Sequence, residues 1–167
     1  MSKSIQILAV ALSSYLLSPF AYSDYDIDHE IAKSIAAIKS ANGHQLSIAT
    51  DRISGSGFTS ATLYNAVEAR MKSLHKQVEL DPNNKSTAED LMALTRAYGS
   101  FGRTESRAYL NDLTLNSKAR GVRNRAKNSA RKLDWYSSRN ALMSSAPTKG
   151  SEQDFMTPRF IALLTSG

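Results

Sequence analysis

The stretch that decides the fold runs from Ser86 to Met143 and reads STAEDLMALTRAYGSFGRTESRAYLNDLTLNSKARGVRNRAKNSARKLDWYSSRNALM. It contains three segments of helical periodicity that are joined by short breaks. The third segment, from about Lys118 onward, carries most of the Lys and Arg residues of the stretch. The pattern therefore predicts three successive helices, of which the last is strongly basic.

The first two of these helices have end signals in the sequence. Ser86-Thr87-Ala88-Glu89 fits a capping box, in which the Ser and Glu side chains bind free N–H groups of the first turn. Gly99 stands where a glycine commonly ends a helix. Thr104 is expected to cap the next, shorter helix, which breaks at Asn116-Ser117. The positions expected to face the core are Leu91, Leu94, Thr95, Tyr98, Ala108 and either Leu110 or Leu113.

The third segment predicts a single basic helix from about Lys118 to Met143. Its apolar positions are spaced four, four and three residues apart, which places them on one helical face. Eight basic residues and only one acid, Asp134, lie between Lys118 and Arg139. The inward positions are Val122, Ala126, Ala130 and Leu133. One flank of that face holds Arg120, Arg123, Lys127 and Arg131, and the other holds Arg125, Lys132 and Arg139.

Two further helices are predicted before this stretch. The first ends at Asn42-Gly43, and its apolar face consists of Ile27, Ile31, Ile35 and Ile38. The second opens at Thr59 or Ser60 and ends at Asp81-Pro82, because proline disfavours helix in the residue before it. Its apolar face consists of Leu63, Val67, Met71, Leu74 and Val78.

The remaining segments have weaker patterns. Residues 43–57 are predicted to form a loop with at most a short helical turn, because Ser54-Gly55-Ser56-Gly57 is typical of flexible turns. Residues 146–150 are expected to form a linker. A final helix is predicted after Ser151 and Asp154, with a late start or a kink at Pro158. Its apolar residues are Phe155, Phe160, Ile161 and Leu164.

These segments add up to six helices and no strand. The sequence thus predicts an all-α fold, either a small antiparallel bundle or a short HEAT-like α-solenoid of about six helices. A chain of 167 residues is long enough for one domain with a substantial core.

Read from Leu94, the central stretch resembles a HEAT or armadillo-type helical repeat. In that family a first helix stops at an Ala-Leu-Gly-like motif, a short helix carries spaced leucines, and Val-Arg opens a helix with spaced alanines. Ala97-Tyr98-Gly99 stands at the stop and Val122-Arg123 at the opening. The match covers about 50 residues, lacks a proline in the first helix, and has Asn116 where Asp is usual. The other matched positions are Leu110, Leu113, Ala126, Ala130 and Leu133.

A solenoid needs about three repeats, and the halves of this chain do not repeat each other. The resemblance therefore implies a HEAT-like helical pair inside a small bundle. In functional terms it implies a scaffold that binds protein, and it implies no chemistry.

Residues 1–23 have the pattern of an export signal. Lys3 provides the positive start, and residues 5–17 are largely apolar but too short to span a bilayer comfortably. Ala21-Tyr22-Ser23 fits the small-x-small motif that signal peptidase recognises. Cleavage after Ser23 would leave one helical domain, residues 24–167, in a bacterial periplasm or outside the cell. A retained membrane anchor is the alternative interpretation.

The sequence contains no signature of catalysis or of metal binding. Without Cys, no disulfide, thiolate zinc site or cysteine nucleophile is possible. Residues 24–28 begin like a calcium-binding EF-hand loop, but His29 and Ile35 stand where Gly and Glu are required. The three histidines, His29, His44 and His75, have no mutual ligand spacing. No nucleophile elbow, phosphate loop or dinucleotide fingerprint is present. We therefore expect no enzyme activity, no metal and no cofactor.

The charge balance favours an anionic partner. The chain has 21 basic and 15 acidic residues, a net charge of +6. The basic helix is either a solvated face or the binding surface for such a partner. Nucleic acid would be bound through its phosphates, but export disfavours it, and an acidic protein or anionic envelope material fits better. The predicted binding residues are Arg123, Arg125, Lys127, Arg131, Lys132, Trp135 and Tyr136.

The leading hypothesis is an exported, periplasmic helical protein that binds another protein with an acidic surface. An immunity or inhibitor protein for a toxin is one concrete version, and an envelope adaptor is another. The alternative is a binder of anionic envelope components, such as lipid head groups or wall polymer. An envelope enzyme is the weakest hypothesis, and the oligomeric state is left open.

Overall fold

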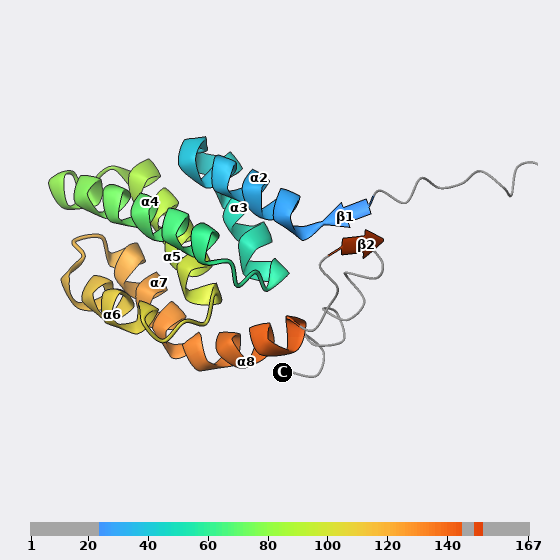
Figure 1. Ribbon diagram of the computed structural model, residues 1–167. Coiled ribbons are helices and arrows are strands. Elements are labelled where there is room, and N and C mark those ends of the chain that lie inside the picture. Colours follow the sequence, from blue (N-terminus) through green and yellow to red (C-terminus); the bar gives the residue numbers. More distant parts are fainter. Residues whose placement is uncertain (1–23, 145–148, 152–167) are drawn as a thin grey trace, which may run out of the picture.

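The computed structural model describes residues 24–144 and 149–151. Within them the chain forms seven helices and one short two-stranded ladder (Figure 1). In chain order the elements are β1 (Asp24–Asp26), α2 (Ile27–Ser40), α3 (Gly43–Ser56), α4 (Ala61–Leu80), α5 (Lys85–Ser100), α6 (Ser106–Asn116), α7 (Arg120–Arg131), α8 (Leu133–Met143) and β2 (Lys149–Ser151). The predicted all-α bundle is confirmed.

The bundle is built around α5, which packs against α3, α4, α6, α7 and α8. Its buried residues Leu91, Leu94 and Tyr98 lie in the centre of a single apolar core. The helical periodicity of the neighbouring helices explains which of their faces pack against α5. The predicted inward positions of α4 and of the basic segment are all buried: Leu63, Val67, Met71, Leu74, Val78, Val122, Ala126, Ala130 and Leu133.

The prediction of a loop over residues 43–57 was wrong, because this segment forms the helix α3. Its buried positions are Leu46, Thr50 and Ile53, so a threonine completes the apolar face and weakens the hydrophobic pattern. The start of α3 is stabilised from outside the segment. The buried carboxylate of Asp90 in α5 accepts a hydrogen bond of 2.8 Å from the Gly43 amide. A side chain 47 residues away thus caps a helix that has no capping side chain of its own.

The prediction of one basic helix was also wrong, because α7 ends at Arg131 and α8 begins at Leu133. At the junction, the Lys132 amide donates to the Ser129 carbonyl over a tight three-residue turn. Figure 1 shows α8 turning away from α7 and running along the end of the bundle, where it packs against α5. The turn lets Asn140 of α8 donate to the carbonyl groups of Ser100 and Phe101, which end α5.

Several predicted end signals act differently in the structure. The capping box was wrong, because Asn84 caps α5 by accepting a hydrogen bond from the Thr87 amide. Gly99 does not end α5 but lies inside it, where a Cβ atom would come within 2.7 Å of Ser129 Cβ in α7. The glycine therefore permits close packing of α5 against α7.

The short helix α6 also differs in detail. It begins at Ser106, two residues after the predicted cap Thr104, and it ends at Asn116 as predicted. Leu110 and Leu113 are both buried, whereas Ala108 is exposed. The spacing of the leucines identified the inward face correctly. Ala108 was a poor indicator, because exposing its small apolar side chain to water costs little free energy.

The two strands were not predicted. β1 and β2 pair antiparallel, with Asp24 opposite Ser151 and Asp26 opposite Lys149. β2 thus lies at the end of the predicted linker. The predicted signal peptide over residues 1–23 and most of the predicted final helix lie outside the described residues. In the part of the chain that the structure describes, no helix has the length and apolar character needed to cross a bilayer.

A network of hydroxyl groups fills the centre of the core. The Tyr64 hydroxyl donates to the Tyr98 hydroxyl at 2.7 Å and lies 3.1 Å from Ser106 Oγ. The Tyr98 hydroxyl donates to the Glu68 carboxylate at 3.3 Å. Tyr109 is the next ring outward, in an edge-on contact with Tyr98. Because these buried hydroxyls have partners, the network joins α4, α5 and α6 without a desolvation penalty for unpaired groups.

This network predicts an alkaline transition that couples tyrosine ionisation to unfolding. Burial raises the pKa of Tyr109 to about 12, with further contributions from Asp112 and Glu68, and burial also raises the pKa of Tyr98 well above its usual range. An unfolded tyrosine ionises near pH 10. From pH 10 upward the unfolded chain therefore loses protons that the folded chain keeps, and stability falls as the pH rises towards 12.

The measurement is a titration of phenolate absorbance in parallel with helical circular dichroism. We expect one fraction of the tyrosine signal to appear near pH 10 and the rest only as the helical signal is lost. Tyr109→Phe should reduce the late fraction and leave the early fraction unchanged. Complete ionisation near pH 10 with the helices intact would contradict the prediction.

Candidate binding surface on helices α7 and α8

The outer side of α7 is positively charged and has no acid of its own. The helix reads RGVRNRAKNSAR, and its apolar face is buried against α5 and α6. We call the exposed cations of α7 and of the α7–α8 junction the basic face. None of them forms an ion pair with another described residue. These residues are Arg120, Arg125, Lys127, Arg131 and Lys132.

The nearest acid in the sequence does not neutralise the basic face. The Asp134 carboxylate in α8 accepts a hydrogen bond of 2.8 Å from Arg107 of α6. No acid among the described residues therefore pairs with the cations of the basic face. Exposed cations of this kind steer negatively charged partners over distances of about a Debye length, roughly 8 Å at physiological salt.

Arg123 differs from the other predicted binding residues. It is half-buried, and its Nη1 donates to the carbonyl groups of Ser117 at 2.7 Å and Lys118 at 3.1 Å. The guanidinium thus fastens α7 to the turn that precedes it. These two hydrogen bonds give Arg123 a structural role in the fold that requires no binding partner.

A hollow of about 290 Å³ lies at the α7–α8 junction, and we call it the cationic hollow. Three of the residues that line it were predicted as binding residues: Arg125, Lys132 and Tyr136. Three others were missed: Arg96 from α5, and Asn128 and Ser129 from α7. Arg96 could not be found from periodicity, because only the packing of α5 against α7 brings it to this place.

The charges around the cationic hollow are incompletely balanced. Arg96 forms an ion pair with Asp51 of α3. Burial lowers the pKa of Arg96, the positive charge of Arg125 lowers it further, and Tyr136 acts in the opposite direction. Arg96 and Arg125 thus line the same hollow as like charges, and of the three cations in the lining only Arg96 is paired with a carboxylate of a described residue.

Two aromatic rings lie beside the cationic hollow. Trp135 is 40% exposed, and its ring centroid lies 4.8 Å from that of Tyr136 at an interplanar angle of 71°. Both rings contact the guanidinium of Arg139, whose Cζ lies 4.8 Å from the Tyr136 centroid and 5.5 Å from the Trp135 centroid. The exposed indole is a residue type favoured at protein interfaces.

Arg139 itself was wrongly placed on the outer flank with Arg125 and Lys132. It is 3% exposed, and its Nη1 donates to the Ser54 carbonyl at 2.9 Å. Its Nε and Nη2 both donate to Asn140 Oδ1. The sevenfold spacing predicted one stripe on a continuous helix, and the break at Lys132 turns Arg139 into the bundle instead.

The remaining predicted binding residues, Lys127 and Arg131, are exposed and do not line the cationic hollow. The structure therefore divides the predicted set into four parts. Arg125, Lys132 and Tyr136 gather at the hollow, Lys127 and Arg131 lie elsewhere on the basic face, and Arg123 holds a turn. Trp135 lies next to the hollow through its contact with Tyr136.

The histidines have separate surroundings. His75 Nδ1 lies 3.1 Å from the Tyr109 hydroxyl, and its Nε2 lies 3.5 Å from the Glu79 carboxylate. His29 and His44 are exposed. Over residues 24–144 and 149–151, no three His, Asp or Glu side chains come together in a way that could hold a metal ion.

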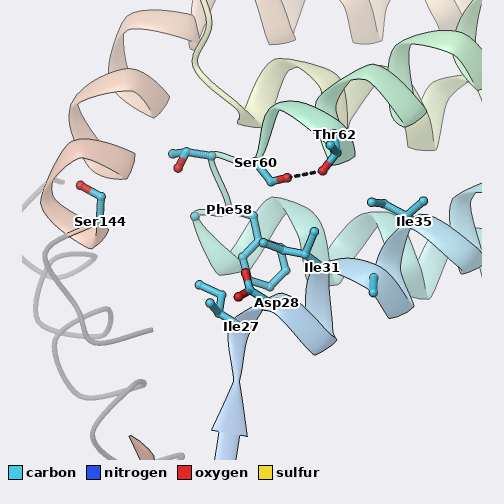
Figure 2. A pocket seen from close by; sticks show the side chains of 11 residues that line it. Ile27, Asp28, Ile31, Ile35, Phe58, Ser60, Thr62 and Ser144 are labelled. Carbon is cyan, nitrogen blue, oxygen red and sulfur yellow. Dashed lines mark hydrogen bonds between the residues drawn. The ribbon is translucent and has the colours of Figure 1, made fainter. Parts of the chain in front are cut away.

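A second hollow of about 550 Å³ lies between α2, the turn before α4 and the end of α8 (Figure 2). Its lining includes Ile27, Ile31, Ile35 and Phe58, and Asp28 is its one charged residue among those described. The Ser60 and Thr62 hydroxyls at its edge bind each other at 2.8 Å. The described lining is apolar on the side of α2, carries hydroxyl groups on Thr59, Ser60, Thr62 and Ser144, and includes no cation among the described residues.

Comparisons with protein-family models, with curated proteins and with solved structures find no match to this chain.

Proposed function

We propose that this chain is an exported helical binding protein that captures another protein through the acidic surface of that partner. The observation that carries the proposal is the basic face, with its five exposed cations and no ion pair to another described residue. Export rests on the signal-like pattern of residues 1–23. An immunity or inhibitor protein, or an envelope adaptor, fits this description, and the chain would act by binding without catalysis.

Three features support a protein partner. The basic face belongs to a helix whose inner side is firmly packed, so its cations are held on a rigid support. The partly exposed Trp135 contacts Tyr136, which lines the cationic hollow, and supplies the kind of aromatic contact that dominates binding energy at protein interfaces. The resemblance of the central stretch to a HEAT-type helical pair is also typical of a scaffold that binds protein.

The experiment is capture from an envelope extract by the mature chain, residues 24–167, at physiological salt. Arg131→Glu with Lys132→Glu is expected to abolish capture of the partner, because reversing two charges places acids against an acidic surface. The control is Lys33→Glu with Lys39→Glu, the same change of charge on two exposed residues of α2. The partner is then identified and its affinity measured with purified components.

The proposal fails if Arg131→Glu with Lys132→Glu leaves every captured partner bound as tightly as before. The basic face would then be only a solvated surface. Loss of capture by the α2 control alone would place the interface elsewhere.

The alternative is direct binding of anionic envelope components. It is favoured by the same excess of exposed cations on α7, since lipid head groups and wall polymers offer negative charge without a shaped surface. Salt separates the two proposals. Binding by charge alone should collapse between low and physiological salt, whereas a packed protein interface should persist. Binding to vesicles of anionic lipid at low salt only would support the alternative.

A further inference from the structure

Cations from three elements converge at the cationic hollow. Arg96 comes from α5, Arg125 from α7, and Lys132 from the α7–α8 junction. One carboxylate, that of Asp51, is paired with Arg96. Among the described residues Arg125 and Lys132 have no ion pair. The hollow therefore gathers more positive charge than the described residues around it balance.

An anion would relieve a repulsion that the fold imposes. Close packing of α5 against α7, permitted by Gly99, brings Arg96 and Arg125 to the same hollow. Arg96 Nε is a buried donor without an acceptor among the described residues, even though the guanidinium is paired with Asp51. Unpaired donors and neighbouring like charges both cost free energy. A negative group in the hollow would reduce the second of these costs.

The other residues of the lining add neutral hydrogen-bond donors. Asn128 contributes an amide, and Ser129 and Tyr136 contribute hydroxyls. Guanidinium groups bind carboxylates and phosphates with two parallel hydrogen bonds. A volume of about 290 Å³ corresponds to roughly ten water molecules at ~30 Å³ each. The hollow thus has room for more than one acidic side chain.

We infer that the cationic hollow is the socket into which the partner protein inserts adjacent carboxylates of an acidic segment. This inference rests on the proposed function and specifies the chemistry that the partner presents. Carboxylates on neighbouring residues match a hollow whose cations come from three separate elements. The Trp135 and Tyr136 rings at its side provide contact for the apolar parts of the same segment.

The test is a titration of the purified mature chain with a hexaglutamate peptide, and separately with inorganic phosphate. The chain has a single tryptophan, Trp135, so its fluorescence reports on the rim of the hollow. Arg125→Gln with Lys132→Gln is expected to weaken peptide binding about tenfold or more, since two charge-assisted contacts are lost. Both residues are exposed, so the variant should fold normally, and circular dichroism checks this.

Two further variants keep the test specific. Lys33→Gln with Lys39→Gln removes the same charge from α2 and should leave peptide binding unchanged. Lys127→Gln with Arg131→Gln removes the same charge from the other flank of α7 and should weaken binding less than the variant in the hollow.

Equal weakening by the two α7 variants would overturn the inference, because the helix would then bind acids only by its overall charge. Tighter binding of phosphate than of the peptide would also overturn it and would assign a phosphate group to the hollow. If neither probe bound, the inference about the cationic hollow would be overturned, but the proposed function would not. The proposed function is tested separately, by the effect of Arg131→Glu with Lys132→Glu on partner capture.

Discussion

Replacing Arg139 by methionine is expected to lower the free energy of unfolding by about 3 kcal/mol, which is a large part of the stability of a typical domain. The guanidinium is buried and donates three hydrogen bonds, one to the Ser54 carbonyl and two to Asn140 Oδ1. Methionine can fill the space but cannot donate, so the buried Asn140 Oδ1 and the half-buried Ser54 carbonyl would both be less well satisfied. The measurement is urea denaturation, in which the midpoint should fall while the slope stays constant.

The control for this prediction is Arg131→Met, eight residues earlier on the exposed basic face. Arg131 has no ion pair among the described residues, so its replacement should change stability by no more than about 0.5 kcal/mol. If the Arg139 variant were as stable as this control, the buried guanidinium would not hold α8 to α3. Arg139→Lys should have a free energy of unfolding close to that of Arg139→Met, because an ammonium group cannot reproduce the planar guanidinium geometry that donates to Ser54 and Asn140 together.

Gly102→Ala is expected to destabilise the fold by about 3 kcal/mol, with contributions from the backbone and from packing. Gly102 has φ +66°, a left-handed conformation that costs an alanine roughly 1 kcal/mol. A Cβ atom would also clash with the Ser137 amide nitrogen and lie 2.6 Å from Ser137 Cα. Because these are backbone atoms of α8, relief of the clash requires the helix to move away from its contacts with the end of α5. Thermal and urea denaturation measure the loss.

Two other glycines separate these contributions. Gly43 has φ +54°, but a Cβ atom added there would meet no described atom within 4 Å, so Gly43→Ala should show the backbone cost of about 1 kcal/mol alone. Gly55 lies inside α3 with ordinary backbone angles and open space, so Gly55→Ala should stabilise the protein by up to about 1 kcal/mol. A loss at Gly102 no larger than that at Gly43 would show that α8 adjusts without cost.

The helices with clear periodicity could be predicted from the chain alone. The apolar positions of α4 are spaced four, four, three and four residues apart, and all of them are buried. The same reasoning correctly placed Val122, Ala126, Ala130 and Leu133 inward. It failed for α3, where Thr50 takes a core position and the capping group is the distant Asp90. A pattern of local hydrophobicity cannot reveal a capping side chain that belongs to another helix, as Asp90 does.

The candidate site shows the same division. Arg125, Lys132 and Tyr136 could be identified from the sequence, because basic and aromatic residues cluster in one segment. Arg96 could not be assigned to the site, since its sequence neighbours give no sign that α5 lies against α7. Arg139 was assigned to the surface because its sevenfold spacing from Lys132 was interpreted on an unbroken helix, whereas the turn at Lys132 buries it.

The sequence by itself determined that this protein is helical, which faces of its clearest helices are buried, and that one segment carries an excess of positive charge. These are properties of residue type and of spacing along the chain, and they need no knowledge of what lies opposite. The tertiary structure alone decided which cations remain exposed, which one is buried, and which of them converge. That outcome depends on the turn at Lys132 and on the close packing of α5 against α7, and both bring together residues that are distant in the sequence.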